Sequence, residues 1–307
     1  MNPQLINLVF AVFLSFLNCD SNQNKAIVQN TPVNENTKTA DPNNFNDYWF
    51  SGTAELNSYD LKQARYGEIR NGEVVLVFVT EPFSASKQVK LDNPKKTPED
   101  DVTIMKLNNV RKFNTGIYDY SILTSTFTPI NTPDYPNTLK SVTSIQEWCG
   151  ITFTQLNLED NHYKYKSFSY FESEGDSEKT IKTALLEDEL FTRIRINKGE
   201  LPEGEITLIP SVLQSRFTHQ NVKPTKAVIV KTKTENLIKY KIEIPSQNRS
   251  ITIDIEKEFP FKIMAWTEDN GDGLLTTATL KKSIRSPYWN QKSLADEKLR
   301  KELLLVK

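Results

Sequence analysis

Apolar and polar residues alternate with a period of two over most of the chain from Tyr48 onward. Residues 239–244 are typical: Lys and Glu alternate with Tyr and Ile, so one face of the strand meets water and the other meets a core. The spacers between such runs are short, which favours hairpins over helical crossovers and therefore an antiparallel sheet. The other runs of strand-forming residues are 102–107, 116–127, 139–148, 151–158, 162–171, 205–209, 226–232, 250–255, 261–267 and 274–281.

The clearest local signal in the chain is a hairpin over residues 65–79. Two strand-like runs, 65–70 and 73–79, flank the dipeptide Asn71-Gly72. Asn-Gly supplies both positive-φ positions of a type I′ turn, so the sequence predicts the turn at these two residues.

Two segments show a helical period. Residues 177–196 place apolar side chains three and four apart, and Ser177 can cap their start. The end of this segment, 191–196, also alternates as a strand would, and spacing alone leaves that alternative open. Near the C-terminus, Ser293 and Asp296 form a capping box ahead of residues 299–305.

These patterns predict a mainly β protein. We expect a large curved antiparallel sheet or half-barrel over residues 47–285, with one covering helix at 177–196, and a C-terminal helical tail over 286–307. A curved sheet either fills its hollow with side chains or leaves room for a ligand. The strands 74–79 and 226–232 are rich in Val and Ile, which line a pleated surface without filling a wide hollow, so we expect room for a ligand.

The N-terminus carries a different pattern, an apolar run over residues 5–17 shortly before Cys19. As a helix this run reaches about 20 Å, short of the ~30 Å hydrocarbon core of a bilayer, so it suits a signal peptide. Apolar segments that stop at a Cys are typical of bacterial lipoproteins, in which that Cys receives a diacylglycerol. We predict a signal peptide over 1–18 and lipidation of Cys19. An ordinary secretory signal and a helix of the mature protein are the alternatives.

The segment 19–46 has the composition of a tether. Asn, Thr and Pro dominate it, and it offers little apolar surface. Such a segment cannot offset the cost of ordering its backbone, about 1–2 kcal/mol per residue, so we predict that it is disordered. It would hold the body close to a membrane, in the cell envelope and at the outer membrane.

Composition excludes several classes of protein. The 307 residues include 38 Lys plus Arg and 39 Asp plus Glu, a balance that argues against a nucleic-acid partner. Two Cys cannot form a disulfide framework, two His make a His-rich metal site improbable, and ten Gly leave little for phosphate-binding loops. No Gly-x-Ser-x-Gly elbow, His-Glu-x-x-His helix or phosphate-binding Gly-Lys-Ser loop occurs, and we expect no cofactor.

Two short motifs nevertheless invite a chemical interpretation. Residues 268–273 resemble a calcium-binding loop, but position twelve is Thr279 where a bidentate Glu is needed, so we interpret them as a hairpin turn. Cys149 would need His162 or His219 to act as a nucleophile, and a free Cys beside Trp148 is more often a small buried residue.

Residues 162–171 are unusually aromatic, with Lys and His interleaved. Stacking on a carbohydrate or a lipid is one interpretation. The other is a single long strand, with Tyr163 and Tyr165 on one face and Phe168 and Tyr170 on the other.

Three blocks carry a resemblance to a known family: residues 48–52 (YWFSG), 147–150 (EWCG) and 286–289 (SPYW). They are similar to Gram-negative lipoproteins of unknown activity whose members are often labelled septum formation inhibitor Maf. True Maf pyrophosphatases carry Ser-x-Ser-Pro-Arg-Arg near the N-terminus, which this chain lacks, so the resemblance transfers no catalytic residue. The end of the body, 259–281, also resembles the closing strands of LolA-type half-barrels, in which a curved sheet shelters an acyl chain.

Our leading hypothesis is a lipid-anchored, non-enzymatic envelope protein that binds a lipid or other apolar ligand or scaffolds an envelope protein. Trp148 and Trp266 are the candidate groove residues. The alternative is a hydrolase-like envelope enzyme whose active residues assemble only in the fold. A deep acidic pocket near Trp266 or Cys149 would favour the enzyme, and a long apolar groove would favour lipid binding.

Overall fold

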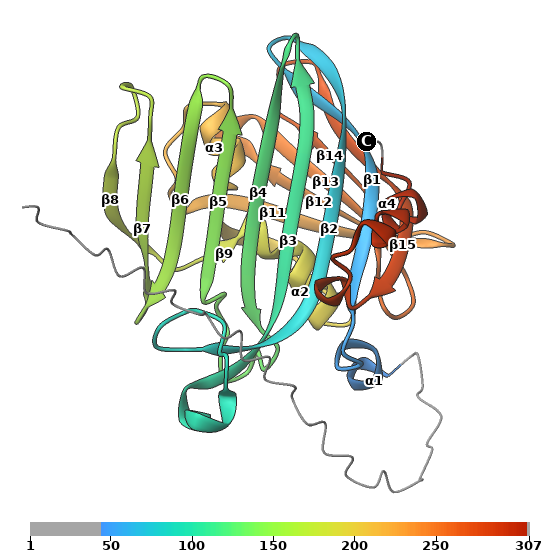
Figure 1. Ribbon diagram of the computed structural model, residues 1–307. Coiled ribbons are helices and arrows are strands. Elements are labelled where there is room, and N and C mark those ends of the chain that lie inside the picture. The colour runs from blue at the N-terminus through green and yellow to red at the C-terminus, as the bar shows by residue number, and fades with distance from the viewer. Residues whose placement is uncertain (1–43, 306–307) are drawn as a thin grey trace, which may run out of the picture. The chain divides into compact units, whose positions relative to one another are not determined.

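The computed structural model describes residues 44–305, which lie in one compact unit (Figure 1). The predicted signal peptide, Cys19 and nearly all of the predicted tether lie outside the described residues. The strands are β1 Ala54–Arg65, β2 Glu68–Ser84, β3 Asp101–Thr115, β4 Tyr118–Pro129, β5 Lys140–Glu147, β6 Gly150–Glu159, β7 His162–Ser169, β8 Ser177–Lys182, β9 Leu185–Leu186, β10 Gly204–Ile209, β11 Thr225–Lys233, β12 Leu237–Ile244, β13 Arg249–Glu256, β14 Ile263–Asp269 and β15 Leu275–Ser286.

Few helices accompany the strands. The α-helices are α1 Phe45–Trp49, α2 Leu190–Ile196, α3 Val212–Phe217 and α4 Lys298–Glu302. The 3₁₀ turns are η1 Pro94–Lys96, η2 Pro98–Asp100, η3 Glu187–Glu189, η4 Pro245–Gln247, η5 Tyr288–Asn290 and η6 Leu294–Glu297.

All fifteen strands belong to one sheet, in the order β8-β7-β6-β5-β4-β3-β2-β1-β15-β14-β13-β12-β11-β10-β9. Consecutive strands pair antiparallel from β1 to β8 and from β10 to β15, β9 pairs parallel with β10, and β8 and β9 do not pair with each other. The first and last strands pair with each other, Ala54 opposite Ser286, and join two meandering halves. The prediction of one large curved sheet, mainly β with few helices, is confirmed; the sheet stays open between its edge strands β8 and β9.

The sheet bends so that its two halves face each other across α2 and α3 (Figure 1). One apolar cluster spans the gap, and it includes residues of β2, of β11 and of α2: Val74, Leu76, Phe78, Ala227, Ile229, Leu190 and Ile194. The hollow that we expected beneath the Val- and Ile-rich strands is therefore filled by side chains, because α2 lies inside the fold instead of covering it.

The predicted helix over residues 177–196 is wrong for most of its length. Its first part forms the edge strand β8, and only Leu190–Ile196 is α-helical. Pairing with β7 gives residues 177–182 a ladder of backbone hydrogen bonds, and Ile181 packs against Tyr163 in a second apolar cluster. Helix propensity is weak enough for such tertiary contacts to override it. The alternative of a strand over residues 191–196 is also wrong.

The first hairpin forms, but its turn lies five residues earlier than predicted. Tyr66 and Gly67 take the two positive-φ positions, with φ of 56° and 73°. Gly72 lies inside β2, opposite Leu61. A Cβ at Gly72 would lie 2.3 Å from a backbone oxygen of β3, so this glycine allows β3 to approach closely.

The C-terminal tail is helical as predicted, and Ser293 with Asp296 forms its capping box. Leu303 packs on the outer face of the sheet, against Leu56 and Val79. The Ser58 hydroxyl donates a hydrogen bond to the Leu303 carbonyl, which ties the tail to β1.

Candidate functional site

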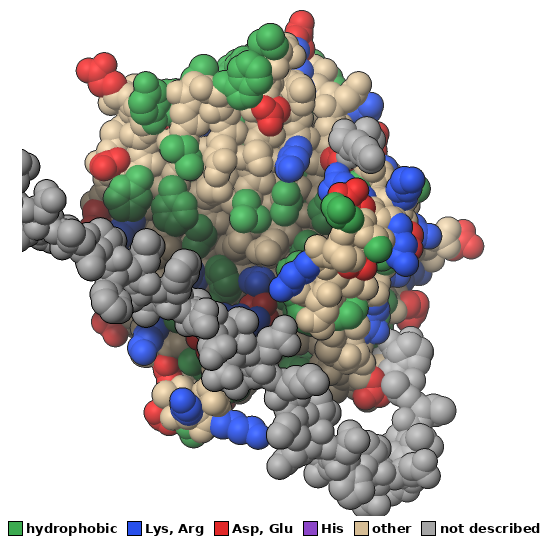
Figure 2. All heavy atoms as spheres, in the orientation of Figure 1, with side chains coloured by type: hydrophobic (Ala, Val, Ile, Leu, Met, Phe, Trp, Pro, Cys, Tyr) green, Lys and Arg blue, Asp and Glu red, His purple; other side chains and the backbone are tan. Residues whose placement is uncertain are grey.

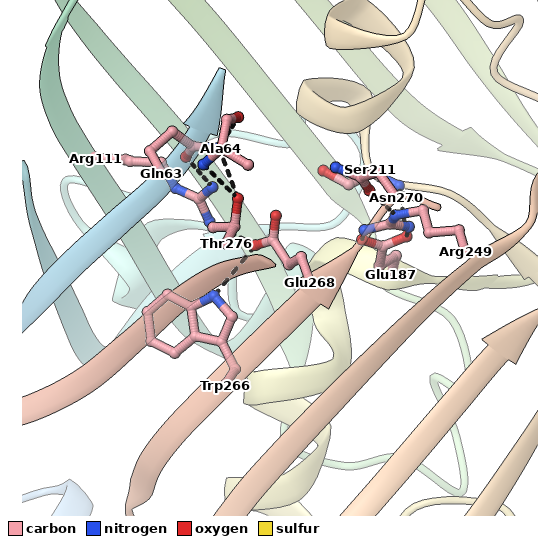
Figure 3. A network of polar contacts seen from close by, with 10 residues as sticks. All are labelled: Gln63, Ala64, Arg111, Glu187, Ser211, Arg249, Trp266, Glu268, Asn270 and Thr276. Atoms are coloured by element: carbon pink, nitrogen blue, oxygen red, sulfur yellow. Dashed lines mark hydrogen bonds and ion pairs between the residues drawn. The ribbon is translucent and has the colours of Figure 1, made fainter. Parts of the chain in front are cut away.

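A buried polar network lies between the two halves of the sheet (Figure 3). Arg111 on β3 donates to Gln63 Oε1 on β1 and to Glu268 Oε1 on β14, each at 2.8 Å. Trp266 donates to the same Glu268 oxygen at 3.2 Å, and Gln63 donates to Thr276 at 3.0 Å. Burial alone would raise the pKa of Glu268, but the Arg111 guanidinium holds it below its usual range. The network therefore keeps Glu268 ionised.

Arg249 on β13 forms the second part of the network (Figure 3). Its two terminal nitrogens bind both carboxylate oxygens of Glu187, at 2.5 and 2.7 Å, and its Nε donates to Asn270 at 3.1 Å. The backbone N–H of Ser211 also donates to Glu187, at 3.1 Å. Bidentate guanidinium–carboxylate pairs are strong and fix orientation, so Glu187 holds the short helical segment η3–α2 to β13.

A cavity of about 60 Å³ lies against this network. Four buried polar atoms on its walls have no hydrogen-bond partner among residues 44–305: Arg111 Nε, Asn109 Oδ1, Thr126 Oγ1 and Gln214 Nε2. Burial raises the pKa of Asp188, also on the wall, to about 6, against hydrogen bonds that lower it. A space of this size suits a few water molecules, and it is too small for a sugar or a lipid.

A second and larger cavity, of about 600 Å³, opens at one end of the strands. We call it the mouth. Its walls come from the ends of β1, β4 and β5, from the turns that follow β1, β5 and β14, and from the end of α3. The residues used below are Arg65, Tyr66, Tyr120, Phe171, Arg216 and Phe217. Gln214 lies on the walls of both the mouth and the small cavity.

Arg65 is the central residue of the mouth. Its guanidinium lies between the Tyr66 ring and the Phe217 ring, 4.1 and 4.2 Å from their centroids. It donates to the Tyr66 hydroxyl at 3.1 Å and to the Phe217 carbonyl at 3.2 Å. Within residues 44–305 no carboxylate pairs with it, and its buried Nε has no partner.

Two tyrosines share a hydrogen bond beside Arg65, with 2.8 Å between the hydroxyls of Tyr66 and Tyr120. Burial raises the pKa of Tyr120. Burial opposes the shift at Tyr66, but the Tyr120 hydroxyl and the Arg65 charge hold the pKa of Tyr66 below its usual value. The mouth therefore combines aromatic faces with hydroxyls that are held in place.

The second arginine of the mouth, Arg216, has an acidic partner. It forms an ion pair with Glu174 at 2.8 Å and stacks on Phe171 at 4.7 Å. His219 Nδ1 lies 3.5 Å from the same Glu174 oxygen. The charge of Arg216 is thus compensated within the protein.

The structure separates the two tryptophans that we expected to share a groove. Trp266 is 3% exposed and lies in the core, against the small cavity. Trp148 is 66% exposed at the turn between β5 and β6, where it donates to Asp119 at 2.8 Å. They do not line one groove.

Cys149 is exposed and lines the mouth, contrary to the expectation of a buried residue. The Glu147 carboxylate raises the pKa of its thiol, which opposes nucleophilic chemistry. His219 lines the same cavity, whereas His162 lies at the turn between β6 and β7. The aromatic strand is as predicted, with Tyr163 and Tyr165 buried and Phe168 and Tyr170 exposed.

Residues 268–273 belong to the hairpin of β14 and β15, as interpreted from the sequence: Glu268 and Asp269 end β14, and the turn begins at Asn270. The Asp269 and Asp272 carboxylates accept from backbone N–H groups of the turn itself, at 2.9 and 3.0 Å. In the part of the chain that the structure describes, no three His, Cys, Asp or Glu side chains gather as metal ligands would.

The mouth could not be predicted from the sequence, because its residues come from strand ends, turns and a helix that are far apart in the chain. Only Tyr66 carried a usable signal, as a neighbour of Gly67 between two strands.

Comparison with protein-family models, with curated proteins and with solved structures finds no match for this chain. No helix within residues 44–305 combines the length and the apolar character needed to cross a membrane.

Proposed function

We propose that this chain is a non-enzymatic binding protein of the cell envelope, held to a membrane through a lipid on Cys19, whose ligand is a small polar molecule with a ring. The observation that carries the proposal is Arg65: a guanidinium between two aromatic rings, without a carboxylate partner, on the wall of a cavity of about 600 Å³. Concave sites that combine aromatic walls with a few convergent polar groups are where small molecules bind.

The residues on the walls of the mouth suggest which chemical groups the ligand carries. A sugar ring or an aromatic ring can stack on Tyr66 or Phe171, and an acidic or hydroxyl group on it can accept from the free N–H groups of Arg65. Because the aromatic rings shield Arg65 from water, contacts to its charge are stronger than at an open surface.

The alternatives find less support. A long acyl chain finds no room between the halves of the sheet, since one side-chain cluster spans them. An enzyme would place its acid at Asp188, whose pKa of about 6 suits that role, but the adjoining cavity of about 60 Å³ is too small for an organic substrate.

Saturation-transfer NMR on the full chain tests the binding proposal. The probes are maltotriose, chitobiose, glucuronate and benzoate, which present sugar and aromatic rings with and without a carboxylate. We expect a saturable signal from at least one probe, lost in Arg65→Leu. Lys241→Ala, on the outer face of β12, is the matched control and should bind as the wild type does. If none of the four probes gives a saturable signal, the mouth is not a site for ring-bearing ligands.

The anchor is tested separately. Cys19→Ser should move the protein from the membrane fraction to the soluble fraction, and palmitate labelling should disappear. A wild-type protein that takes up no palmitate would refute the anchor and leave the binding proposal standing.

A further inference from the structure

A third cavity, of about 530 Å³, lies on the inner side of β6, β7 and β8. Its opposite wall is formed by α3 and the residues that follow it, up to Val222, and β8 is an edge strand of the open sheet (Figure 1). We call this space the side cavity. Arg216 and His219 line both the side cavity and the mouth, so the two spaces are neighbours with otherwise separate walls.

The strands beside the side cavity have their polarity inverted. On β6 and β7, Thr152, Thr154 and Ser167 point inward and line the cavity. Ile151 and Phe168 point outward and are 49% and 50% exposed, and Figure 2 shows hydrophobic side chains gathered on this outer face. A strand with one face on a core normally turns its apolar side chains inward. The hydroxyl groups inside therefore indicate that this part of the interior meets polar groups.

The hydroxyl groups of the side cavity retain capacity for hydrogen bonds. Thr154 and Ser167 share one hydrogen bond at 3.0 Å, which leaves one of their two protons without an acceptor. Ser215 on α3 is 5% exposed, and its buried Oγ has no partner within residues 44–305. A buried polar group without a partner is costly, so a ligand that reaches Ser215 gains a hydrogen bond that the described part of the chain does not make.

The side cavity also contains a cation without an acidic partner, Lys179 on β8. Its ammonium lies 4.7 Å from the centroid of the Tyr165 ring, on the residue opposite it in the ladder. Within residues 44–305 no carboxylate pairs with Lys179, and the adjacent Glu178 pairs instead with Lys164 and Lys166. Burial lowers the pKa of Lys179, as expected for a charge that lacks a counter-ion.

The remaining groups on the walls argue against two other classes of ligand. Glu174 is already used, since its oxygens accept from Arg216 and from the Ser169 hydroxyl, each at 2.8 Å, so no carboxylate is left for a cationic ligand. Tyr165 is the only Tyr, Phe or Trp among the described residues that line the cavity, and Lys179 lies over its ring. An aromatic ligand would therefore find no open ring to stack on, in contrast to the mouth.

We propose that the side cavity is a second binding site, for a sugar that carries an acidic group. The acidic group binds the Lys179 ammonium, a compact charge that suits a phosphate or a carboxylate. The sugar hydroxyls bind Thr152, Ser215 and their neighbours, because hydroxyl groups on both sides can donate and accept. The volume of about 530 Å³ is typical of small-molecule sites. The site stands independently of the ligand at the mouth.

Isothermal titration calorimetry on the full chain tests the site, with glucose 6-phosphate and glucuronate as probes. We expect saturable binding of at least one probe, weakened about ten- to a hundred-fold in Lys179→Met and retained in Lys179→Arg. Ser215→Ala should weaken binding about two- to ten-fold without lowering the melting temperature, since its hydroxyl has no partner within residues 44–305. Lys182→Met, an exposed position on the outward side of β8 with the same change of charge, is the matched control. The titrations are repeated in Arg65→Leu, which disables the mouth.

Each outcome decides the proposal. Binding that Lys179→Met weakens, and that both Lys182→Met and Arg65→Leu leave in place, supports it, provided that the variants keep their circular dichroism spectra and melting curves. If Lys179→Met does not keep them, the loss of affinity in Ser215→Ala decides. Three results overturn the proposal: no saturable binding of either probe, equal binding by the wild type and Lys179→Met, or inorganic phosphate bound as tightly as glucose 6-phosphate. Binding that Arg65→Leu abolishes also overturns it and would place the probe in the mouth.

Discussion

The arginines inside the fold and the arginine at the mouth differ in whether a carboxylate compensates their charge. Arg195 and Glu55 are both fully buried and lie 2.5 Å apart, with Tyr48 also donating to Glu55. Burial alone would raise the pKa of Glu55, but Arg195 holds it below its usual value. Arg65 at the mouth, like Arg195, lies against two aromatic rings, but no carboxylate within residues 44–305 pairs with it.

The other interior arginines follow Arg195. Arg193 pairs with Glu189 at 2.7 Å, Arg111 with Glu268 at 2.8 Å, and Arg249 with Glu187. A buried charge without a partner is costly, so these pairs belong to the architecture, whereas an uncompensated charge on a cavity wall is free to bind a ligand. The comparison predicts that substitutions inside change stability and that substitutions at the mouth change binding.

The largest effect is expected at Glu55. Glu55→Gln leaves the Arg195 charge buried without a partner, which should lower the free energy of unfolding by about 3–5 kcal/mol. Urea denaturation at pH 7 measures this. Glu243→Gln, on the outer face of β12, is the control and should stay within about 0.5 kcal/mol of the wild type. Equal stabilities of the two variants would show that the interior pair is not architectural.

Asp188 is a buried carboxylate without an arginine bound to it. Arg249 binds the neighbouring Glu187 and leaves Asp188 with only neutral hydrogen-bond donors. Its pKa is raised from 3.8 to about 6, so the folded state binds more protons than the unfolded state between these values and stability falls as pH rises through them. Asp188→Asn removes this loss. The variant should be about 1–3 kcal/mol more stable than the wild type at pH 7, and the difference should vanish near pH 4. A gain of the same size at both pH values would contradict the role of ionisation.

The smallest effect on stability is expected at the mouth. Arg65→Leu removes two hydrogen bonds and two ring contacts but leaves no charge unpaired, so the free energy of unfolding should change by about 1 kcal/mol or less. Urea denaturation beside Arg216→Leu, which removes the arginine partner of the Glu174 carboxylate, provides the internal comparison. A loss at Arg65 as large as that at Glu55 would assign Arg65 to the architecture.

The sheet was predictable from the sequence, and the reasons for the errors are physical. Alternation with a period of two identified the strands because one of their faces is buried. The prediction of a helix at 177–196 was wrong because pairing with β7 outweighs a helical spacing. The prediction of a turn at Asn71-Gly72 was wrong because Gly72 allows two strands to approach each other closely. Neither contact is visible within a short window of sequence.

The site was harder to predict than the fold. Arg65, Tyr120 and Phe217 come from different strands and a helix, and only the bend of the sheet brings their ends together. The tryptophans attracted attention by size alone. Cys149 and His219 were singled out from the sequence as a possible nucleophile and its base, and the fold places both on the wall of the mouth.

Cys149 also provides the most direct test of the central claim, that the ligand binds in the mouth. Its thiol is exposed on the wall of that cavity, so its rate of alkylation by iodoacetamide, followed by mass spectrometry of the full chain, reports whether the mouth is occupied. With the probe that gives the NMR signal, we predict that alkylation slows in proportion to occupancy and that Arg65→Leu abolishes the protection. An alkylation rate that stays unchanged while the probe is bound would place the ligand elsewhere and contradict the account.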